Sequence, residues 1–474
     1  MILINNWQLL IAHFQLIFLF LKTMQESAKN IHLIAMGGSV MHALAIALKR
    51  QGFNVAGSDD QFFDPAKTAL ADAGLKTTPG WNETAITTAI DFVVLGMHAQ
   101  LDNPELLKAQ ELGLTIYSFP EFIYQQSKNK QRIVVGGSHG KTTITSMMMH
   151  VLKYYNKNFD YVVGADVIGF DNRVQLSDAP VIIIEGDEYL SSRLDPTPKF
   201  LRYQHHIGVI SGIAWDHINV FKTEADYIEQ FRKFVVSTPK AGSLVYNDED
   251  TVASKLGNTE GLDINYLPFT IPNHSIKEGI TYLETDSAAL ELKIFGKHNL
   301  ANMSAAREVL VKLGINQKEF NKAIQSFELP SLRLDELLKK GSFTIYRDYA
   351  HAPSKVKATT EAVKAQDKSK SLVGVLELHT YSSLNKDFLP HYKNTLASCD
   401  KAIVFVDPEA IAIKKLEPIS NNDIETAFGL STIKIVNNAA ELEAELFTIT
   451  KENTNLLLMS SGNFGGLDFK SLFL

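Results

Sequence analysis

Residues 132–143 read RIVVGGSHGKTT, and this stretch decides the fold class of the chain. Arg132–Val135 is apolar enough to predict a β-strand, and the residues from Lys141 to about Tyr155 predict a helix. The glycines between them let backbone N–H groups approach phosphate oxygens, and the helix N-terminus adds partial positive charge. A strand, a glycine-rich turn and a helix that starts with Gly-Lys-Thr together predict a site for nucleotide phosphates.

The residues of this loop have separate expected roles. We assign Lys141 to the terminal phosphates of the nucleotide and the Thr142 hydroxyl to Mg²⁺. The strict pattern G-x-x-x-x-G-K-[ST] would need glycine where Val135 stands, so the loop is shorter than that of the common nucleoside triphosphatases. The residues expected to bind the nucleotide are Gly137, Ser138, His139, Gly140, Lys141, Thr142 and Thr143.

Length and composition limit the possible classes of protein. At 474 residues the chain is too long for one compact core, and its 45% hydrophobic residues are typical of globular proteins. A net charge of −7 and the lack of a basic block give a nucleic-acid partner no electrostatic support. The single cysteine, Cys399, excludes an internal disulfide and a cysteine-based zinc site, which fits a cytoplasmic protein.

The N-terminal residues differ from the rest of the chain. Trp7–Leu21 is apolar but shorter than the roughly 20 residues needed to span a bilayer. No basic segment precedes it and no small-residue cleavage site follows it, so a signal peptide fits poorly. We expect residues 1–23 to be an upstream extension or a disordered tail, without stable membrane insertion; a membrane anchor is the alternative.

Apolar runs alternate with amphipathic stretches almost throughout the chain, which is typical of parallel sheets with crossover helices. We therefore predict an α/β fold of three consecutive units. Ser127–Gln131 and Phe327–Ser331 look like the boundaries between them. After the extension at 1–23, the predicted domains are 24–129, 130–329 and 330–474.

Individual elements follow from the same patterns. Short segments with Asn, Gly and Pro between about Leu244 and Phe295 predict a small β-rich insertion. The predicted strands are 31–36, 54–57, 91–96, 114–117, 132–135, 181–184, 207–213, 343–347, 372–376, 402–406 and 456–459. The predicted helices are 40–50, 141–155, 224–235, 299–313 and 354–365.

Acidic residues and a histidine follow two of the apolar strands. Glu185-Gly186-Asp187-Glu188 comes directly after 181–184, and Asp216-His217 follows 207–213. Ligands of open α/β sheets lie at the carboxyl ends of the strands. Carboxylates beside a triphosphate would repel it without a cation, so they predict Mg²⁺, which prefers oxygen ligands. A solvated acidic loop and a structural histidine are the alternatives.

Six motifs resemble, in the same order, those of the Mur ligase family of peptidoglycan synthesis, from Ile31 to the C-terminus. The order of all six is far more specific than any one of them. They are GSHGKTT at 137–143, EGDEY at 185–189, DH at 216–217, GKHNLAN at 296–302, LRLDEL at 332–337 and DYAHAP at 348–353.

The resemblance implies a division of labour among three domains. A Rossmann-like first domain would bind UDP-N-acetylmuramate, a central P-loop ATPase-type domain would bind ATP and Mg²⁺, and a Rossmann-like C-terminal ligase domain would close over the nucleotide. The implied substrate-binding residues are Gly37, Gly38, Met41, Ser58, Asp59, Asp187 and Glu188. The implied catalytic residues are Lys141, Glu185, His217, Arg333 and Asp348. The implied metal ligands are Thr142, Glu185 and His217, and Asn299, Asn302, Arg333 and Asp348 would contact the nucleotide.

Four positions depart from the family pattern, and none of them removes a residue that phosphoryl transfer needs. Ala35 stands for a glycine, and Arg347 stands for the first acid of Asp-Asp-Tyr. Leu332 stands for a second arginine beside Arg333, and Ala352 for the second histidine of His-His-Pro.

The resemblance also implies a reaction, in which ATP activates the lactyl carboxylate of UDP-N-acetylmuramate as an acyl phosphate that an amine then attacks. Residues 188–203 and 456–467 resemble those of members that attach the tripeptide L-Ala-γ-D-Glu-meso-diaminopimelate in peptidoglycan recycling. Residues 378–383 (LHTYSS) lack the arginines of members that add L-alanine. We therefore expect the tripeptide as the amine, with L-alanine as the alternative.

Two other classes of function fit less well. A nucleotide-binding regulator that had lost catalysis should have lost some of Lys141, Glu185, His217, Asn299, Arg333 and Asp348, and all are present. A P-loop GTPase switch would need a guanine-reading Asn-Lys-x-Asp segment, which the chain lacks.

Overall fold

The computed structural model describes residues 29–430 and 432–473. The prediction for residues 1–23 lies outside the described residues. Among the described helices, none is long and apolar enough to cross a membrane. The described residues form two compact units: one runs to Phe122 and includes Ser192–Asp195, and the other comprises Ile123–Ser191 and the residues from Pro196 on.

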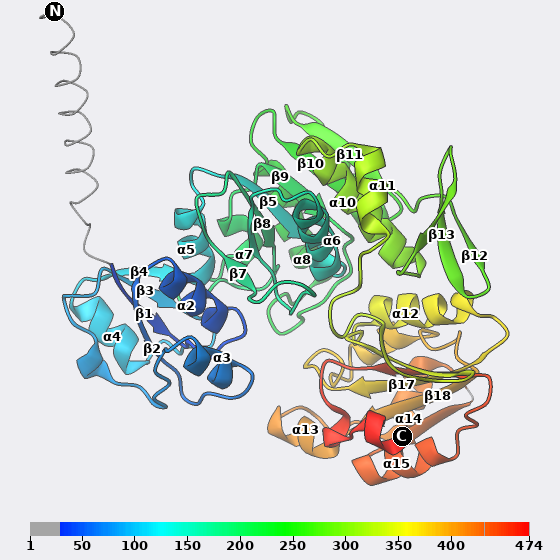
Figure 1. Ribbon diagram of the computed structural model, residues 1–474. Coiled ribbons are helices and arrows are strands. Elements are labelled where there is room, and N and C mark those ends of the chain that lie inside the picture. The colour runs from blue at the N-terminus through cyan, green and yellow to red at the C-terminus, as the bar shows by residue number, and fades with distance from the viewer. Residues whose placement is uncertain (1–28, 431, 474) are drawn as a thin grey trace, which may run out of the picture. The chain divides into compact units, whose positions relative to one another are not determined.

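The first unit contains a four-stranded parallel sheet in the order β2-β1-β3-β4 (Figure 1). The predicted strands and the predicted helix of this unit are confirmed to within two residues at each end. The strands are β1 (Asn30–Ile34), β2 (Asn54–Ser58), β3 (Phe92–Leu95) and β4 (Thr115–Ser118). The helices are α2 (Met41–Arg50), α3 (Ala66–Asp72), η1 (Glu83–Ala85) and α4 (Pro104–Glu111), followed at the unit boundary by α5 (Phe119–Gln126).

The second unit begins with a seven-stranded sheet in the order β11-β10-β9-β5-β8-β6-β7, in which only β7 is antiparallel to its neighbour. Because β9, β5 and β8 are adjacent and parallel, their carboxyl ends lie side by side. The strands are β5 (Gln131–Gly136), β6 (Asp160–Val162), β7 (Val174–Gln175), β8 (Val181–Glu185), β9 (Ile207–Ile210), β10 (Ser243–Asn247) and β11 (Asn265–Phe269).

Helices cover both faces of this sheet, which explains why its strands are continuous apolar runs. One face packs on α6 (Lys141–Tyr154), α10 (Lys297–Lys312) and α11 (Gln317–Ile324). On the other face, Phe200 of α7 (Lys199–Arg202) stacks on Phe234 of α8 (Glu224–Val236). The remaining helix, α9 (Thr251–Gly257), packs against β10 and β11.

The predicted β-rich insertion between Leu244 and Phe295 is wrong in its extent. The strands β10 and β11 extend the central parallel sheet, with α9 between them. Only β12 (His274–Lys277), β13 (Ile280–Glu284) and β14 (Ala289–Leu292) form a separate antiparallel sheet. The seven residues of α9 are too few to show a helical period in the sequence, so this strand–helix–strand unit resembles a run of short strands.

The polar stretch Ser127–Gln131, which the sequence suggests as a boundary between units, makes several polar contacts. The buried Lys130 lies 2.9 Å from the buried Asp160 carboxylate and also donates to two backbone carbonyls. Arg132 donates from Nη1 to the Ser127 carbonyl at 2.8 Å. These contacts attach the stretch to the central sheet.

The C-terminal sheet has six strands in the order β15-β16-β20-β17-β18-β19, and within it only β15 is antiparallel to its neighbour. Successive residues of β20 face opposite sides: Leu457 and Met459 lie in the core under α12, whereas Leu456 and Leu458 lie in the core under α15 and α16. The strands are β15 (Asp335–Lys340), β16 (Phe343–Asp348), β17 (Ser371–Leu378), β18 (Lys401–Val406), β19 (Ile433–Val436) and β20 (Thr454–Met459). The helices are α12 (Pro353–Gln366), η2 (Leu389–Tyr392), α13 (Pro408–Ile413), α14 (Asn421–Phe428), α15 (Ala439–Phe447), η3 (Phe464–Gly466) and α16 (Phe469–Phe473).

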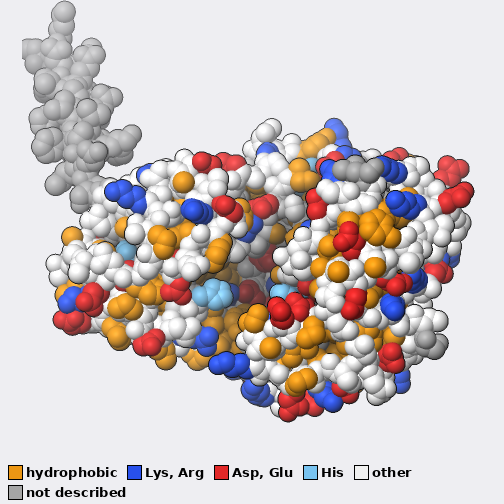
Figure 2. Space-filling model, turned by 90° about the horizontal axis from the view of Figure 1, so that it is seen from below, with side chains coloured by type: hydrophobic (Ala, Val, Ile, Leu, Met, Phe, Trp, Pro, Cys, Tyr) orange, Lys and Arg blue, Asp and Glu red, His pale blue; other side chains and the backbone are white. Residues whose placement is uncertain are grey.

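The predicted α/β fold with largely parallel sheets is confirmed. The predicted domain boundary at 329/330 lies inside the second unit, and the domain boundaries stay predictions. On the face of the molecule in Figure 2, Lys and Arg side chains are interspersed with Asp and Glu.

Candidate nucleotide and metal site

The phosphate loop joins β5 to α6 at the carboxyl edge of the central sheet. Gly137 and Gly140 have φ angles of 131° and 79°, which L side chains rarely adopt. A Cβ atom at Gly137 would lie 2.0 Å from Ser211 Oγ, and one at Gly140 would lie 2.4 Å from Asn302 Oδ1. Both positions therefore need glycine. Val135 is a fully buried strand residue, so the loop starts after it.

A cavity of about 270 Å³ opens beside this loop and includes residues that precede and follow β16. It brings together residues from five of the six predicted motifs. Asp216 and His217, which form the remaining motif, do not line it, and of the acids at 185–188 only Glu185 does. The predicted nucleotide-site residues that line it are Ser138, His139, Gly140, Lys141, Thr142, Thr143, Glu185, Asn299, Asn302, Arg333 and Asp348.

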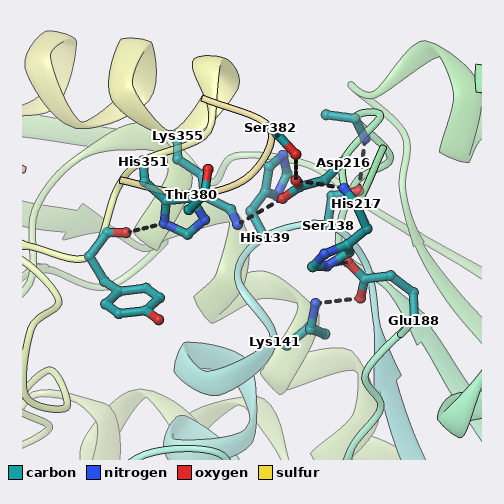
Figure 3. Close-up of polar contacts among 12 residues, drawn as sticks. Ser138, His139, Lys141, Glu188, Asp216, His217, His351, Lys355, Thr380 and Ser382 are labelled. Atoms are coloured by element: carbon teal, nitrogen blue, oxygen red, sulfur yellow. Dashed lines mark hydrogen bonds and ion pairs between the residues drawn. The ribbon is translucent and has the colours of Figure 1, made fainter. Parts of the chain in front are cut away.

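Lys141, the first residue of α6, has two close acceptors. Its Nζ donates to the Gly137 carbonyl at 2.6 Å and lies 2.5 Å from Glu188 Oε2 (Figure 3). Burial lowers the pKa of Lys141, but Glu188 and Asp187 outweigh it and raise the pKa above its usual value. Burial raises the pKa of Glu188, but Lys141 and His217 bring it well below its usual range. Both groups are therefore charged at neutral pH.

Thr142 and Glu185, two of the predicted metal ligands, form a pair. Thr142 Oγ1 donates to Glu185 Oε1 at 2.9 Å, and the Gly164 backbone N–H donates to the other carboxylate oxygen at 2.8 Å. This acid thus lies at the N-terminus of α6, where a cation bound to phosphates could reach it.

His217, the third predicted metal ligand, groups with the two acids assigned to substrates. One possible ligand atom from each of Asp187, Glu188 and His217 lies within 4.8 Å of the others. His217 Nε2 is 3.6 Å from Glu188 Oε1, and the His217 ring packs edge-on against Tyr189 at 5.1 Å. The sequence could not reveal this grouping, because it depends on how the chain bends after Glu185.

His217 also has an unusual backbone conformation, with a φ of 56°. Such left-handed residues other than glycine cost free energy and cluster at functional sites. Burial lowers the pKa of His217, but the Glu188 carboxylate and Asp216 raise it above its usual value.

The donor atoms present fit Mg²⁺, since carboxylates and a threonine hydroxyl are hard oxygen ligands. Two of the acids are now neutralised by lysines: Glu188 by Lys141, and Asp187 by Lys199 at 2.6 Å. A cation bound by these acids would therefore have to replace the lysines that now pair with them. Histidine is the less usual member of the set.

Asp348 and Arg333 flank the cavity opposite the phosphate loop. The buried Asp348 carboxylate accepts hydrogen bonds from the backbone N–H groups of Leu334 at 2.8 Å and Ala350 at 2.7 Å. Arg333 lies over the Tyr349 ring at 4.9 Å. Leu332 and Leu334, with φ angles of 59° and 49°, are both left-handed. Asp348 therefore fixes the strained loop that presents Arg333.

The two asparagines predicted at the nucleotide, Asn299 and Asn302, lie on the buried side of α10. Asn299 Nδ2 donates to the Phe295 carbonyl at 3.0 Å, which ties this side chain to the start of the helix. Asn302 approaches the loop at Gly140, so α10 packs directly over the phosphate loop.

The sequence did not single out Lys355, which lines the same cavity from the first turn of α12. Its Nζ lies 4.0 Å from Asp216 Oδ2 (Figure 3). Burial lowers the pKa of Lys355. Burial raises the pKa of Asp216, but His217 and Lys355 bring it down to about 2. The sequence did contain a signal for this role: Lys355 comes just after the DYAHAP motif, at the start of the helix that follows a strand.

Two histidines near Lys355 add no positive charge at neutral pH. Burial, together with the charge of Lys355, lowers the pKa of His139 and of His351 to about 4. The cations of the cavity are therefore Lys141, Arg333 and Lys355.

In the first unit, the predicted sugar-nucleotide residues cluster after β1 and β2. The Gly37 N–H donates to Asp59 Oδ2 at 2.8 Å. Ala35, which replaces a family glycine, has a φ of 66°, so the chain keeps the conformation that favours glycine. Ser58 donates its hydroxyl to Glu105, and the Met41 side chain is buried. Contacts of these last two residues with a ligand would therefore come from their backbone.

Comparison with known proteins places the chain in a family. Residues 30–131 match the model of the Mur ligase family, catalytic domain, and residues 135–310 match that of the Mur ligase middle domain. A UDP-N-acetylmuramate--L-alanine ligase of Caldicellulosiruptor saccharolyticus is 32% identical over 405 residues, which cover 83% of this chain and 86% of the relative.

Two further similarities cover nearly the whole length. A UDP-N-acetylmuramate--L-alanyl-gamma-D-glutamyl-meso-2,6-diaminoheptandioate ligase of Haemophilus influenzae is 25% identical over 455 residues, 94% of this chain and 98% of the relative. The crystal structure of a UDP-N-acetylmuramate-alanine ligase from Thermotoga maritima has a TM-score of 0.67 at 20% identity, over 92% of this chain and 96% of that chain. The chain belongs to the Mur ligase family of ATP-dependent ligases, which form amide bonds on peptidoglycan precursors.

Proposed function

We propose that the protein joins the lactyl carboxylate of UDP-N-acetylmuramate to an amine and converts ATP to ADP and phosphate. The observation that carries this proposal is the cavity that combines a phosphate loop with Arg333, Asp348 and the strand-end acid Glu185. Phosphate release that depends on both UDP-N-acetylmuramate and an amine tests it. Phosphate release that is independent of the sugar nucleotide would refute it.

The chemistry requires activation, because a carboxylate is a poor electrophile at neutral pH. In the proposed first step, a lactyl oxygen attacks the γ-phosphorus and ADP leaves. In the second, the neutral amine attacks the acyl carbon, and phosphate leaves with that oxygen while the amine gives up a proton. Bringing two anions together needs positive charge, which Lys141 and Arg333 would supply.

We propose that Thr142, Glu185 and His217 hold Mg²⁺, with Asp187 and Glu188 close enough to take part. Mg²⁺ would neutralise the phosphates during transfer. Asn299 and Asn302 would contact the nucleotide from α10, and Asp348 would act by holding the Arg333 loop in place. Gly37, Gly38 and Asp59 would bind the sugar nucleotide, within a first domain proposed to end at residue 129.

For the amine we propose L-alanine, which the relatives of at least 30% identity support by their names. The tripeptide is the second candidate. The segment with Thr380, Ser382 and Ser383 favours it, because family members that add L-alanine tend to carry arginine there. The similarity to the Haemophilus influenzae ligase also favours it.

The two amines can be compared directly with purified protein, ATP, Mg²⁺ and UDP-N-acetylmuramate. Phosphate release with L-alanine and not with L-Ala-γ-D-Glu-meso-diaminopimelate is the expected result. Release with the tripeptide alone would reverse the assignment of the amine and leave the acyl-phosphate chemistry intact.

A further inference from the structure

Lys355 is a mostly enclosed cation that lacks a close partner. Its side chain is 24% exposed, and the nearest carboxylate oxygen, Asp216 Oδ2, is 4.0 Å away. Within residues 29–430 and 432–473, no acceptor lies within hydrogen-bond distance of its Nζ. By contrast, Lys130, Lys141 and Lys199 each have a carboxylate oxygen within 2.9 Å. An enclosed ammonium group without a hydrogen-bond acceptor is costly, so this position is suited to binding an anion.

The place of Lys355 identifies the anion. It lines the cavity of the phosphate loop together with Lys141, Thr142 and Arg333. It also lies in the first turn of the 14-residue helix α12, whose N-terminus adds partial positive charge. Lys141 is the first residue of α6, directly after the phosphate loop, whereas Lys355 belongs to α12, which follows β16. The cavity thus has a cation on two sides.

We propose that Lys355 binds the terminal phosphoryl group of ATP, opposite Lys141, and that Asp216 positions it there. This inference rests on the proposed function. During transfer, the ammonium group would stay on the phosphoryl oxygens as the bond to ADP breaks and the bond to the carboxylate oxygen forms. Asp216 is suited to positioning, because its Oδ1 accepts from the His217 N–H at 2.7 Å while Oδ2 faces Lys355.

Lys355 should contribute to the binding of a nucleoside triphosphate but not to the binding of a diphosphate. A residue that touches only the γ-phosphate should matter for AMP-PNP and not for ADP. Losing a hydrogen bond to a charged group costs about 1.5–3 kcal/mol, so Lys355→Ala should weaken binding of Mg²⁺–AMP-PNP by about tenfold or more. Binding of Mg²⁺–ADP should change by less than about threefold, and Lys355→Arg should restore part of the loss.

Isothermal titration calorimetry of the full chain with both nucleotides tests this. Lys357→Ala is the matched control, since Lys357 lies on the same helix, is 61% exposed and pairs with Glu361 at 3.9 Å. Equal losses for AMP-PNP and ADP, or no loss for either, would overturn the proposal. Lys355→Gln, compared in the same way, replaces the alanine variant if that variant does not fold.

The outcome is separable from that of the proposed function. In one outcome, Lys355→Ala weakens the binding of AMP-PNP, but the wild-type protein releases no phosphate with UDP-N-acetylmuramate and either amine. This outcome would refute the proposed substrate and support the phosphate role of Lys355. Phosphate release that is insensitive to Lys355→Ala and Lys355→Gln would refute the role of Lys355 and support the substrate.

Discussion

The Lys141 ammonium group lies 2.5 Å from the Glu188 carboxylate, and both groups are enclosed at the carboxyl edge of the central sheet. Breaking one partner of a buried ion pair leaves an uncompensated charge, which typically costs about 3–5 kcal/mol. Binding of phosphates to Lys141 would therefore be more favourable when a cation binds Glu188 and compensates its charge. We therefore expect the pair to couple nucleotide binding to metal binding.

Lys141→Ala should abolish turnover, because it removes the positive charge of the phosphate loop and the lysine partner of Glu188. We expect at least about a 10³-fold loss of kcat/KM in a phosphate-release assay, or roughly 4 kcal/mol of transition-state stabilisation. Lys157→Ala, at an exposed position after α6, is the control and should behave as wild type. Wild-type activity of Lys141→Ala would remove the basis for the loop assignment.

Glu188→Gln should weaken both the metal site and the orientation of Lys141. The carboxylate also accepts from the Tyr227 hydroxyl at 3.0 Å, so its loss disturbs a buried network. We expect a loss of activity of about 10²-fold or more, and half-maximal activity at a higher Mg²⁺ concentration. Glu229→Gln, which changes an exposed acid paired with Arg232 on α8, should leave both quantities unchanged. An unchanged Mg²⁺ dependence of Glu188→Gln would argue against its place near the metal.

Asp348→Asn should act through the loop that carries Arg333. The carboxylate accepts from two backbone N–H groups, and an amide has only one oxygen to replace it. We expect the KM for ATP to rise and the thermal midpoint to fall by a few degrees, as for about 1–2 kcal/mol of lost stability. An Arg333→Ala variant separates the two effects, because it should raise the KM without lowering the midpoint. A normal KM in both variants would contradict this account.

Stability should decrease when the pH falls from about 6.5 toward 4. The pKa of His139 and His351 is about 4 in the folded state against 6.5 for ordinary histidine. Between these two pH values the unfolded state therefore binds more protons than the folded state, which favours unfolding. Keeping these two rings neutral costs almost nothing above pH 6.5. The cost rises as the pH falls toward 4 and reaches about 2 kcal/mol for each histidine at pH 5. The acids Asp187, Glu188 and Asp216, with lowered pKa, lose their effect only below about pH 4.5.

Thermal midpoints between pH 7.5 and pH 5 check this expectation. His351→Gln, which stays neutral throughout, should show a smaller fall than wild type. An equal fall in both proteins would mean that His351 does not titrate as described.

The sequence predicted the elements that carry strong hydrophobic patterns. Continuous apolar runs such as Val181–Ile184 and the Gly-Lys-Thr turn placed β8, β5 and α6 almost to the residue. Weak patterns were less informative. The strand β15 (DELLKK) is a polar edge strand, and α9 is short, so neither was anticipated.

At the candidate site, sequence order could place residues at strand ends but could not pair their side chains. Glu185 and Glu188 are close in sequence, yet one contacts Thr142 and the other Lys141. Likewise, Lys355 and Asp216 come from distant segments, and only the fold brings them together. Such pairs depend on tertiary packing, which motif spacing does not encode.

The central claim is that the lactyl carboxylate of UDP-N-acetylmuramate becomes an acyl phosphate. Oxygen transfer measures it most directly: UDP-N-acetylmuramate labelled with ¹⁸O in the lactyl carboxylate is converted with ATP and the amine, and the released phosphate is examined by mass spectrometry. The account predicts one ¹⁸O atom in each phosphate that accompanies an amide bond. Unlabelled phosphate formed together with the amide would contradict it.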